Sequence, residues 1–330
     1  MPFAPILFFL EFSFAHVSFF FFSPGEFNRA EVTKKTRHGA TALHLSSQYN
    51  QVEIVQLLLR HRDIDSNAVD LNGNAPLHMA CSNGHVEPAR LLLQSRANHL
   101  FKNLRGETPL HLACKWGSEA IVVLLIQEGK KTGKGTGVNE VTREGNSPLH
   151  LTTTELVGYI LLKNGAKLTS ESLFSSFFLS WSVNSLISTF RVQNEAGLTP
   201  LHKACQTGNV GLCELYLQGN ARVNALDVGR RTPLHSAVCE GHTMVAQLLV
   251  EKYHADINAR SRNGNTPLHA AAANGKDEVA SYLLSLGADF RIRNTRRQTA
   301  YQLVGKNAAL KAAFENTPGF LGGSEGSSLF

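Results

Sequence analysis

Short apolar runs recur in pairs along most of this 330-residue chain. A first run ends at a glycine or asparagine, and a second run follows at once, as in Val52 to Leu58 and Val245 to Val250. Glycine or asparagine at that place is what a left-handed helix end requires. A polar segment with a further glycine then closes a hairpin turn before the next pair. The pattern predicts a repeated unit of helix, tight turn, helix and hairpin loop.

Two sets of residues mark these turns. The first helices are predicted to end at Asn50, Gly84, Gly117, Gly208, Gly241 and Gly275. The hairpins are predicted to turn at Gly39, Gly73, Gly106, Gly145, Gly197 and Gly264. One such unit cannot bury its apolar face alone, so the units must stack to form a core.

Each predicted unit opens with the tetrapeptide Thr-Pro-Leu-His or a close variant of it. A Thr ahead of a helix can accept a bond from an unpaired backbone N–H, and Pro is tolerated at the first helical position. The seven histidines of these tetrapeptides lie 34, 33, 39, 52, 33 and 34 residues apart. A period near 33 with this signature resembles the ankyrin repeat, over roughly residues 37 to 316. The tetrapeptides begin at Thr41, Ala75, Thr108, Ser147, Thr199, Thr232 and Thr266.

The resemblance implies an all-α repeat solenoid, with stacked helix-turn-helix units and β-hairpin loops. Residues 37–168 then hold repeats 1 to 4, and residues 192–316 hold repeats 5 to 8. The fourth repeat is degenerate, because three residues and the glycine turn are missing after His150. The eighth repeat keeps Thr299 but loses Pro and His, and is interpreted as a polar cap. Residues 317–330 are expected to form a flexible tail.

Two segments do not fit the repeat. Residues 169–191 form a Ser- and Phe-rich insertion, and residues 1–30 hold ten of the chain's 19 phenylalanines. Runs of Phe, Ser and Leu are what pyrimidine-rich nucleotide tracts encode, so translated non-coding sequence is the first explanation for both segments. A membrane anchor is the second explanation for the N-terminal segment, and the basic residues from Arg29 to Arg37 would then hold the repeats on the cytoplasmic side.

No group of residues in the sequence points to catalysis or to a bound metal or cofactor, so we predict a non-enzymatic chain. Cys81, Cys114 and Cys205 each lie three residues after a tetrapeptide histidine, which indicates a small buried residue rather than a disulfide or a zinc ligand. The Gly- and Lys-rich stretch 129–137 lacks the spacing of a phosphate-binding loop and is interpreted as a flexible basic loop. The ankyrin resemblance implies that the tetrapeptide histidines bond nearby backbone and hydroxyl groups.

The net charge of +6 is concentrated toward the C-terminus. Residues 222–311 hold 13 Lys and Arg against 7 Asp and Glu, whereas the rest of the chain has 19 of each. Many of these arginines fall on predicted hairpin tips. They either keep the array soluble or form a patch for an acidic or phosphorylated segment of a partner. Nucleic acid is disfavoured, because few aromatic residues interleave with the arginines.

The resemblance implies a scaffold that binds another protein through a concave groove of hairpin tips and first helices. Trp116 is the foremost candidate, because other repeats have Tyr, Asn, Thr or Glu at its position and an exposed Trp is a typical hot spot. The predicted partner-binding residues are Tyr49, Asn72, Asn83, Arg105, Lys115, Trp116, Thr207, Arg231, Glu240, Arg260, Arg262, Asn274, Arg293 and Arg297.

Two other roles stay open at this point. The chain could be the regulatory portion of a larger protein, such as a cation channel or a ubiquitin-ligase substrate adaptor. It could also be a scaffold anchored to a membrane through residues 1–23. Free cysteines suit a reducing compartment, which predicts a cytoplasmic location with the nucleus as the alternative. The weakest joint of the stack is expected in residues 150–191.

Overall fold

The regular elements of the structure are helices throughout the described residues, which confirms the predicted all-α repeat fold. The computed structural model describes residues 33–168, 193–305 and 307–319. The Phe-rich segment 1–30, the predicted insertion 169–191 and residues 320–330 of the predicted tail lie outside the described residues. The chain divides into two compact units, one ending at Gly137 and one beginning at Val138.

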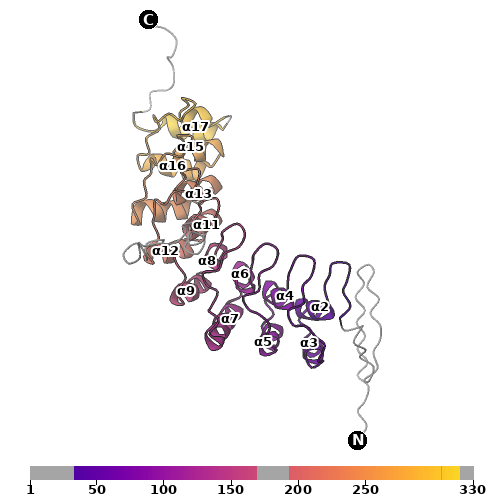
Figure 1. The fold of residues 1–330 in the computed structure, drawn as a ribbon. Coiled ribbons are helices and arrows are strands. Elements are labelled where there is room, and N and C mark those ends of the chain that lie inside the picture. Colours follow the sequence, from indigo (N-terminus) through magenta and orange to yellow (C-terminus); the bar gives the residue numbers. More distant parts are fainter. Residues whose placement is uncertain (1–32, 169–192, 306, 320–330) are drawn as a thin grey trace, which may run out of the picture. The chain divides into compact units, whose positions relative to one another are not determined.

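The described part of the first unit consists of helix pairs arranged in two rows (Figure 1). The first-helix row contains α2 (Ala42–Gln48), α4 (Pro76–Ser82) and α6 (Pro109–Lys115). The second-helix row contains α3 (Val52–Leu59), α5 (Val86–Gln94) and α7 (Glu119–Thr132). Leu43, Ala80, Leu92 and Ile121 are fully buried between the rows, and they form the shared core that stacking was predicted to produce.

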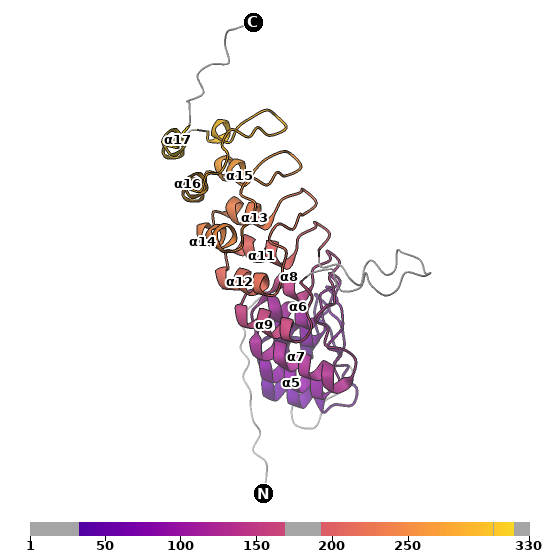
Figure 2. The ribbon, with the colours of Figure 1, turned by 90° about the vertical axis from the view of Figure 1, so that its left-hand side faces the viewer.

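The second unit repeats this arrangement, again with a row of first helices and a row of second helices (Figure 2). The first-helix row contains α8 (Pro148–Leu151), α11 (Pro200–Thr207), α13 (Pro233–Glu240), α15 (Pro267–Ala273) and the single 3₁₀ turn η3 (Tyr301–Leu303). The second-helix row contains α9 (Glu155–Lys163), α12 (Val210–Gln218), α14 (Thr243–Gln247) continued by the π-helical η2 (Leu248–Lys252), α16 (Asp277–Ser285) and α17 (Ala308–Glu315). Hairpin loops project from the first-helix row on the side away from the second helices (Figure 2).

Each tetrapeptide histidine is tied to the start of its own repeat. Its Nδ1 accepts the backbone N–H of the residue three positions earlier, at 3.1–3.2 Å in all seven repeats. This bond confirms the local role that the family resemblance implied. The Nε2 nitrogen therefore carries the ring proton.

The same histidines also join one repeat to the next, which the sequence did not predict. Nε2–H donates to a backbone carbonyl of the following hairpin, as from His78 to Glu107 O at 3.1 Å and from His202 to Arg231 O at 3.1 Å. His150 makes the equivalent bond to Leu198 O at 3.0 Å, although the two are 48 residues apart. The stack of the second unit is therefore continuous between the residues that flank the predicted insertion.

Backbone bonds between neighbouring tips hold the hairpins at a fixed spacing. Leu104 N donates to Asn72 O at 2.9 Å, and Arg262 N donates to Gly229 O at 2.7 Å. The glycines at the six predicted hairpin turns have φ of 72° to 78°, in the left-handed region that was predicted. A Cβ on Gly197 would lie 2.6 Å from a backbone nitrogen of the next hairpin, so a side chain at this position of the repeat meets both strain and crowding.

The fourth repeat is shortened as the sequence predicted. Helix α8 has four residues, whereas the other tetrapeptide helices have seven or eight. Two side chains donate to carbonyls of this short helix. Thr152 Oγ1 donates to Pro148 O at 3.0 Å, and the buried Tyr216 donates its hydroxyl to Leu149 O at 2.9 Å.

The interpretation of residues 129–137 as a flexible loop is wrong for its first part. Residues up to Thr132 continue α7, which reaches 14 residues and ends at Gly133 in the left-handed conformation. The buried Gly129 allows the returning chain to pass close by, because a Cβ there would collide with Gly135 O. The return is also fixed by the His99 ring, whose Nε2 lies 3.0 Å from Gly135 O.

Candidate partner-binding surfaces

All fourteen predicted partner-binding residues are exposed in the structure. They lie at two places in the repeat, namely in or next to the hairpins and at the C-terminal ends of first helices. In the first unit these residues are Asn72, Arg105, Tyr49, Asn83, Lys115 and Trp116. In the second unit they are Arg231, Arg260, Arg262, Arg293, Arg297, Thr207, Glu240 and Asn274.

The first unit presents large apolar side chains at both places. Trp116 and Tyr49 end α6 and α2, and they are 63% and 56% exposed. Leu71 and Leu104, on two successive hairpin tips, are 67% and 54% exposed. The sequence prediction missed both leucines. The signal was available, because an apolar residue directly after the Asp or Asn that starts a tight turn has no core to enter.

Several of the predicted polar residues bond to their own helix. The side-chain amides of Asn83 and Asn274 donate to the carbonyls of Met79 and Ala270 at 2.8 and 2.9 Å. Thr207 Oγ1 donates to Ala204 O at 3.0 Å. These side chains satisfy carbonyls at a helix end, so Trp116 and Tyr49 supply more of the contact area that an incoming chain would meet.

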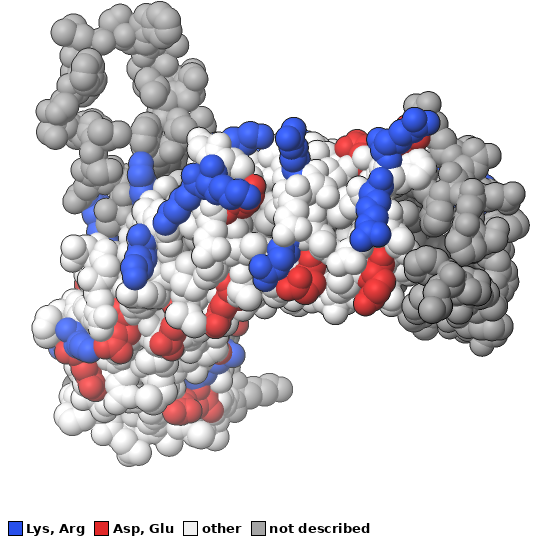
Figure 3. Space-filling view, turned by 90° about the horizontal axis from the view of Figure 1, so that it is seen from below, with Lys and Arg blue, Asp and Glu red and all other residues white. Residues whose placement is uncertain are grey.

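The second-helix side of the first unit is different in character. Seen from that side, basic and acidic side chains are interspersed (Figure 3). Each second helix of the first unit has a glutamate in its first turn, namely Glu53, Glu87 or Glu119. A carboxylate there complements the helix dipole, so these charges have a local structural reason. Leu57 is 55% exposed on α3 and serves as a control position on this side.

The second unit presents arginines on three successive hairpins, 227–231, 261–265 and 294–298. Two of the predicted site arginines form side-chain hydrogen bonds within the chain. Arg231 Nε donates to Asp227 Oδ2 at 2.8 Å, and Arg260 Nη2 donates to Arg293 O at 2.9 Å. Five exposed arginines on or next to these three hairpins make neither an ion pair nor a side-chain hydrogen bond within the described residues, and these are Arg230, Arg262, Arg293, Arg296 and Arg297.

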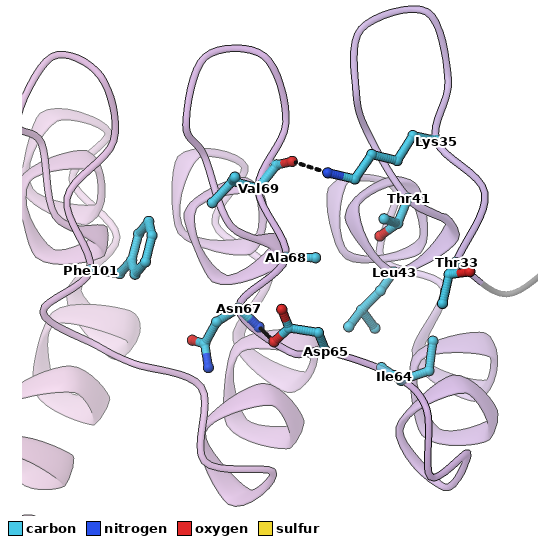
Figure 4. A pocket seen from close by; sticks show the side chains of 10 residues that line it. All are labelled: Thr33, Lys35, Thr41, Leu43, Ile64, Asp65, Asn67, Ala68, Val69 and Phe101. Atoms are coloured by element: carbon cyan, nitrogen blue, oxygen red, sulfur yellow. Dashed lines mark hydrogen bonds between the residues drawn. The ribbon is translucent and has the colours of Figure 1, made fainter.

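A pocket of about 410 Å³ lies at the start of the first unit (Figure 4). It lies between the start of α2 and the segment that leads to the second hairpin, and Leu43 and Ile64 give it an apolar side. Lys35 Nζ donates to Val69 O at 3.0 Å across its upper edge. Its ionisable groups are Lys35 and Asp65, and neither is buried. The pocket therefore lacks the buried acid–base pair that catalysis would use.

The buried ionisable groups of the stack are held in their neutral forms. Burial raises the pKa of the Cys81 and Cys205 thiols well above the usual range, as expected for small core residues. All five cysteines are free thiols. Within the described ranges no three His, Cys, Asp or Glu residues are grouped to hold a metal ion. None of the described helices is long and apolar enough to cross a membrane.

Two ankyrin-repeat family models match most of this chain. Residues 16–103, 95–172 and 178–261 match a family model described as ankyrin repeats (3 copies), and residues 248–304 match one described as ankyrin repeats (many copies). The chain is similar to the probable 26S proteasome regulatory subunit p28 of Saccharomyces cerevisiae, with 29% identity over 230 residues, 68% of this chain and 75% of that protein.

Two other similar proteins are much longer than this chain. Human rabankyrin-5 is 28% identical over 207 residues, which cover 61% of this chain and 15% of that protein. Human transient receptor potential cation channel subfamily A member 1 is 26% identical over 231 residues, 64% of this chain and 21% of that protein. Among solved structures, the human ASB11 ankyrin repeat domain is 24% identical and covers 83% of this chain and 96% of that chain, with a TM-score of 0.49.

Proposed function

Because the chain belongs to the ankyrin-repeat family, whose members generally mediate protein–protein interaction without catalysis, we propose that it is a binding scaffold. The surface that we assign to binding is formed by the hairpin tips and first helices of the first unit. Its members include the exposed apolar residues Tyr49, Leu71, Leu104 and Trp116. Exposed aromatic side chains of this kind are enriched at the centres of protein interfaces.

The observation that carries the proposal is the exposure of Trp116. An isolated exposed leucine needs no explanation, but a Trp that is 63% exposed leaves a large apolar area in water. It sits at the end of α6, where it is not needed to close the helix, since Asn83 and Asn274 occupy the same position elsewhere. Burial against a partner would remove that area from water.

The partner that we propose includes an acidic or phosphorylated segment. The support is the set of unpaired arginines on the hairpins of the second unit, where carboxylate or phosphate oxygens could accept charge-assisted hydrogen bonds. Five free thiols suit a reducing compartment, so the location that we propose is the cytoplasm. The nucleus, or a membrane surface reached through residues 1–23, is the alternative.

A second candidate function follows from the similarity to the yeast p28 protein, of which the chain covers 75%. In this version the scaffold is a subunit that docks on a 26S proteasome. Cosedimentation of the full chain with purified 26S proteasomes would support it, and absence of the chain from the proteasome fractions would remove it. A regulatory portion of a longer protein, such as a cation channel or a ubiquitin-ligase adaptor, is a further alternative, because the chain spans only 15% and 21% of two of its relatives.

The main proposal can be tested with peptides selected from a library of natural protein segments on the immobilised full chain. The tightest selected peptide is then titrated against Trp116→Ala and against Leu57→Ala, which removes an apolar side chain of similar exposure from the second-helix side. We expect Trp116→Ala to lose about 2 kcal/mol of affinity and Leu57→Ala to lose little. If the peptide bound the wild type and Trp116→Ala with equal affinity, Trp116 would not belong to the binding surface.

A further inference from the structure

Two hairpins of the second unit break a rule that the other described hairpins keep. Six hairpins turn at a glycine with positive φ, but the hairpins 227–231 and 294–298 have arginine at the same position. Arg230 and Arg297 adopt the left-handed conformation, with φ of 56° and 61°. A residue with a Cβ is disfavoured there by about 1 kcal/mol or more, whereas glycine is not.

No ion pair or side-chain hydrogen bond within the described residues offsets this cost. Both arginines are exposed, and neither forms an ion pair or a side-chain hydrogen bond there. Their neighbours Arg231 and Arg260, by contrast, bond to Asp227 and to the Arg293 carbonyl. Strained residues that stabilise nothing in their own chain are typical of functional sites.

The free arginines form a row along three tips. Arg230 lies on the first tip, Arg262 on the second, and Arg296 and Arg297 on the third. Asp227 is the one acidic residue within these three described hairpins, and its side chain is fully buried against Arg231. The tips are linked by backbone bonds from Arg262 N to Gly229 O at 2.7 Å and from Thr295 N to Asn263 O at 3.0 Å, so the arginine row has a fixed spacing.

We propose that the arginine row, Arg230, Arg262, Arg296 and Arg297, binds an extended polypeptide segment whose Asp or Glu side chains are three residues apart. Packed helices lie about 8 to 10 Å apart, which is the spacing expected of the repeats that carry the tips. An extended chain advances about 3.3 Å per residue, so about three residues span one repeat. This inference rests on the proposed scaffold function and specifies its partner, but it involves different residues from the Trp116 surface.

The geometry favours carboxylates over the alternatives. A phosphate group is typically held by several arginines that converge on it, whereas the first two tips each offer one free guanidinium. A single-stranded nucleic acid would require aromatic side chains for its bases to stack on, and none lies on the three described hairpins. One carboxylate for each tip would pair with the single free arginine on each of the first two tips and would lie beside two arginines on the third.

The test uses the full chain and fluorescein-labelled nine-residue peptides, with binding followed by fluorescence anisotropy. The spaced peptide has Glu at its first, fourth and seventh positions and Ser elsewhere. The clustered peptide has the same composition with its three Glu residues adjacent. A Ser-phosphorylated peptide, a single-stranded oligonucleotide and vesicles with anionic lipid are the competing probes.

The variant is Arg230→Gly/Arg262→Gln/Arg297→Gly, in which two arginines become the residue that other hairpins have. The control is Arg60→Gln/Lys130→Gln/Lys163→Gln, which loses the same charge from exposed positions on second helices. We expect the control to bind the spaced peptide like the wild type and the variant to bind it about tenfold more weakly. The midpoint of urea unfolding of the variant should equal or exceed that of the wild type.

Three results would overturn the proposal. One is equal binding of the spaced peptide by the variant and the control, or no binding by the wild type. Another is equal affinity for the spaced and clustered peptides. The third is tighter binding of the phosphorylated peptide, the oligonucleotide or the vesicles than of the spaced peptide. None of these results bears on Trp116→Ala, so the scaffold proposal and the arginine proposal fail separately.

Discussion

Neutral histidines hold neighbouring repeats together. In His78, Nδ1 accepts the N–H of Ala75 while Nε2–H donates to Glu107 O, so a second ring proton would point at an N–H donor. Burial lowers the pKa of His78 from 6.5 to about 4. Burial also lowers the pKa of the equivalent residues, which are His44, His202, His235 and His269.

These depressed pKa values predict that acid destabilises the array. Between pH 6.5 and about 4 the unfolded chain binds protons that the folded chain excludes, so the histidine contribution is complete above pH 6.5 and is lost as the pH falls. For His78 alone the shift corresponds to about 3 kcal/mol. Urea unfolding at a series of pH values should show this fall. His78→Gln should make the fall shallower, because the other buried histidines remain, whereas the exposed control His38→Gln should leave it unchanged. A flat wild-type profile would contradict the assignment.

Residues at the hairpin turns were predictable from the sequence only in part. Turn glycines such as Gly197 were predictable, because a glycine recurs two residues before the Thr of the tetrapeptide. Their φ in the structure is positive, as a turn at that place requires. The same conformation at Arg230 and Arg297 was not, because nothing in an arginine indicates a left-handed backbone. The bonds from Nε2 to the next hairpin were missed for a related reason, since they join residues about 30 positions apart.

Individual elements absorb the irregularities of the repeat length in different ways. The six extra residues between His111 and His150 lengthen α7 to 14 residues and add the return past Gly129. The one extra residue between His235 and His269 coincides with the π-helical η2, since a π turn accommodates an added residue. Spacing predicted that something was added, but the number of residues alone does not distinguish a longer helix from a longer loop.

The shortened helix α8 depends on a side chain from the next repeat. Helix α8 ends at Leu151, and the Tyr216 hydroxyl donates to Leu149 O at 2.9 Å. Tyr216→Phe should leave a buried carbonyl unsatisfied and lower the free energy of unfolding by about 1 to 2 kcal/mol. Tyr159→Phe, which changes an exposed tyrosine on α9, is the control.

Hydrogen exchange would locate the effect of Tyr216→Phe. In the wild type, amides of residues 150–168 should open at lower free energy than those of α11 to α16, because α8 has only four residues. The Tyr216→Phe variant should widen that difference. Equal protection in the two regions, or a loss in Tyr159→Phe as large as in Tyr216→Phe, would show that the fourth repeat is not a weak joint.

The molecule as a whole follows the repeat that its histidines mark, but its binding surfaces were only partly predictable. Exposure followed from position in the repeat, so all fourteen predicted residues are exposed. The hydrogen bonds of each exposed side chain could not be predicted from its position in the repeat, because they depend on the neighbouring repeat. Arg260, for example, donates to Arg293 O and so braces the stack, whereas Arg262 is unpaired within the described residues.

The spacing of the repeats also sets the number of residues that connect the end of one repeat to the next hairpin, and the predicted insertion lies in one such connection. Five residues lie between Ala97 and Asn103, and the same number separates Ala221 from Asp227. Each pair joins the end of one repeat to the start of the next hairpin. The equivalent pair in the fifth repeat is Ala166 and Asn194. Deleting residues 170–191, which retains Thr169, would restore five residues between them.

This deletion should leave the array folded and stabilise it by about 1 kcal/mol, because closing a shorter connection costs less entropy. The bonds on either side that must persist are His150 Nε2 to Leu198 O at 3.0 Å and Asn194 Nδ2 to Asn146 Oδ1 at 2.8 Å. Urea unfolding compares the deletion with the wild type, and a second variant that deletes four further residues, 166–169, is the control for register. The second variant should unfold more easily, since its connection is too short to reach the hairpin. If the first deletion also prevented folding, the segment 170–191 would be a structural part of the stack rather than an addition to it.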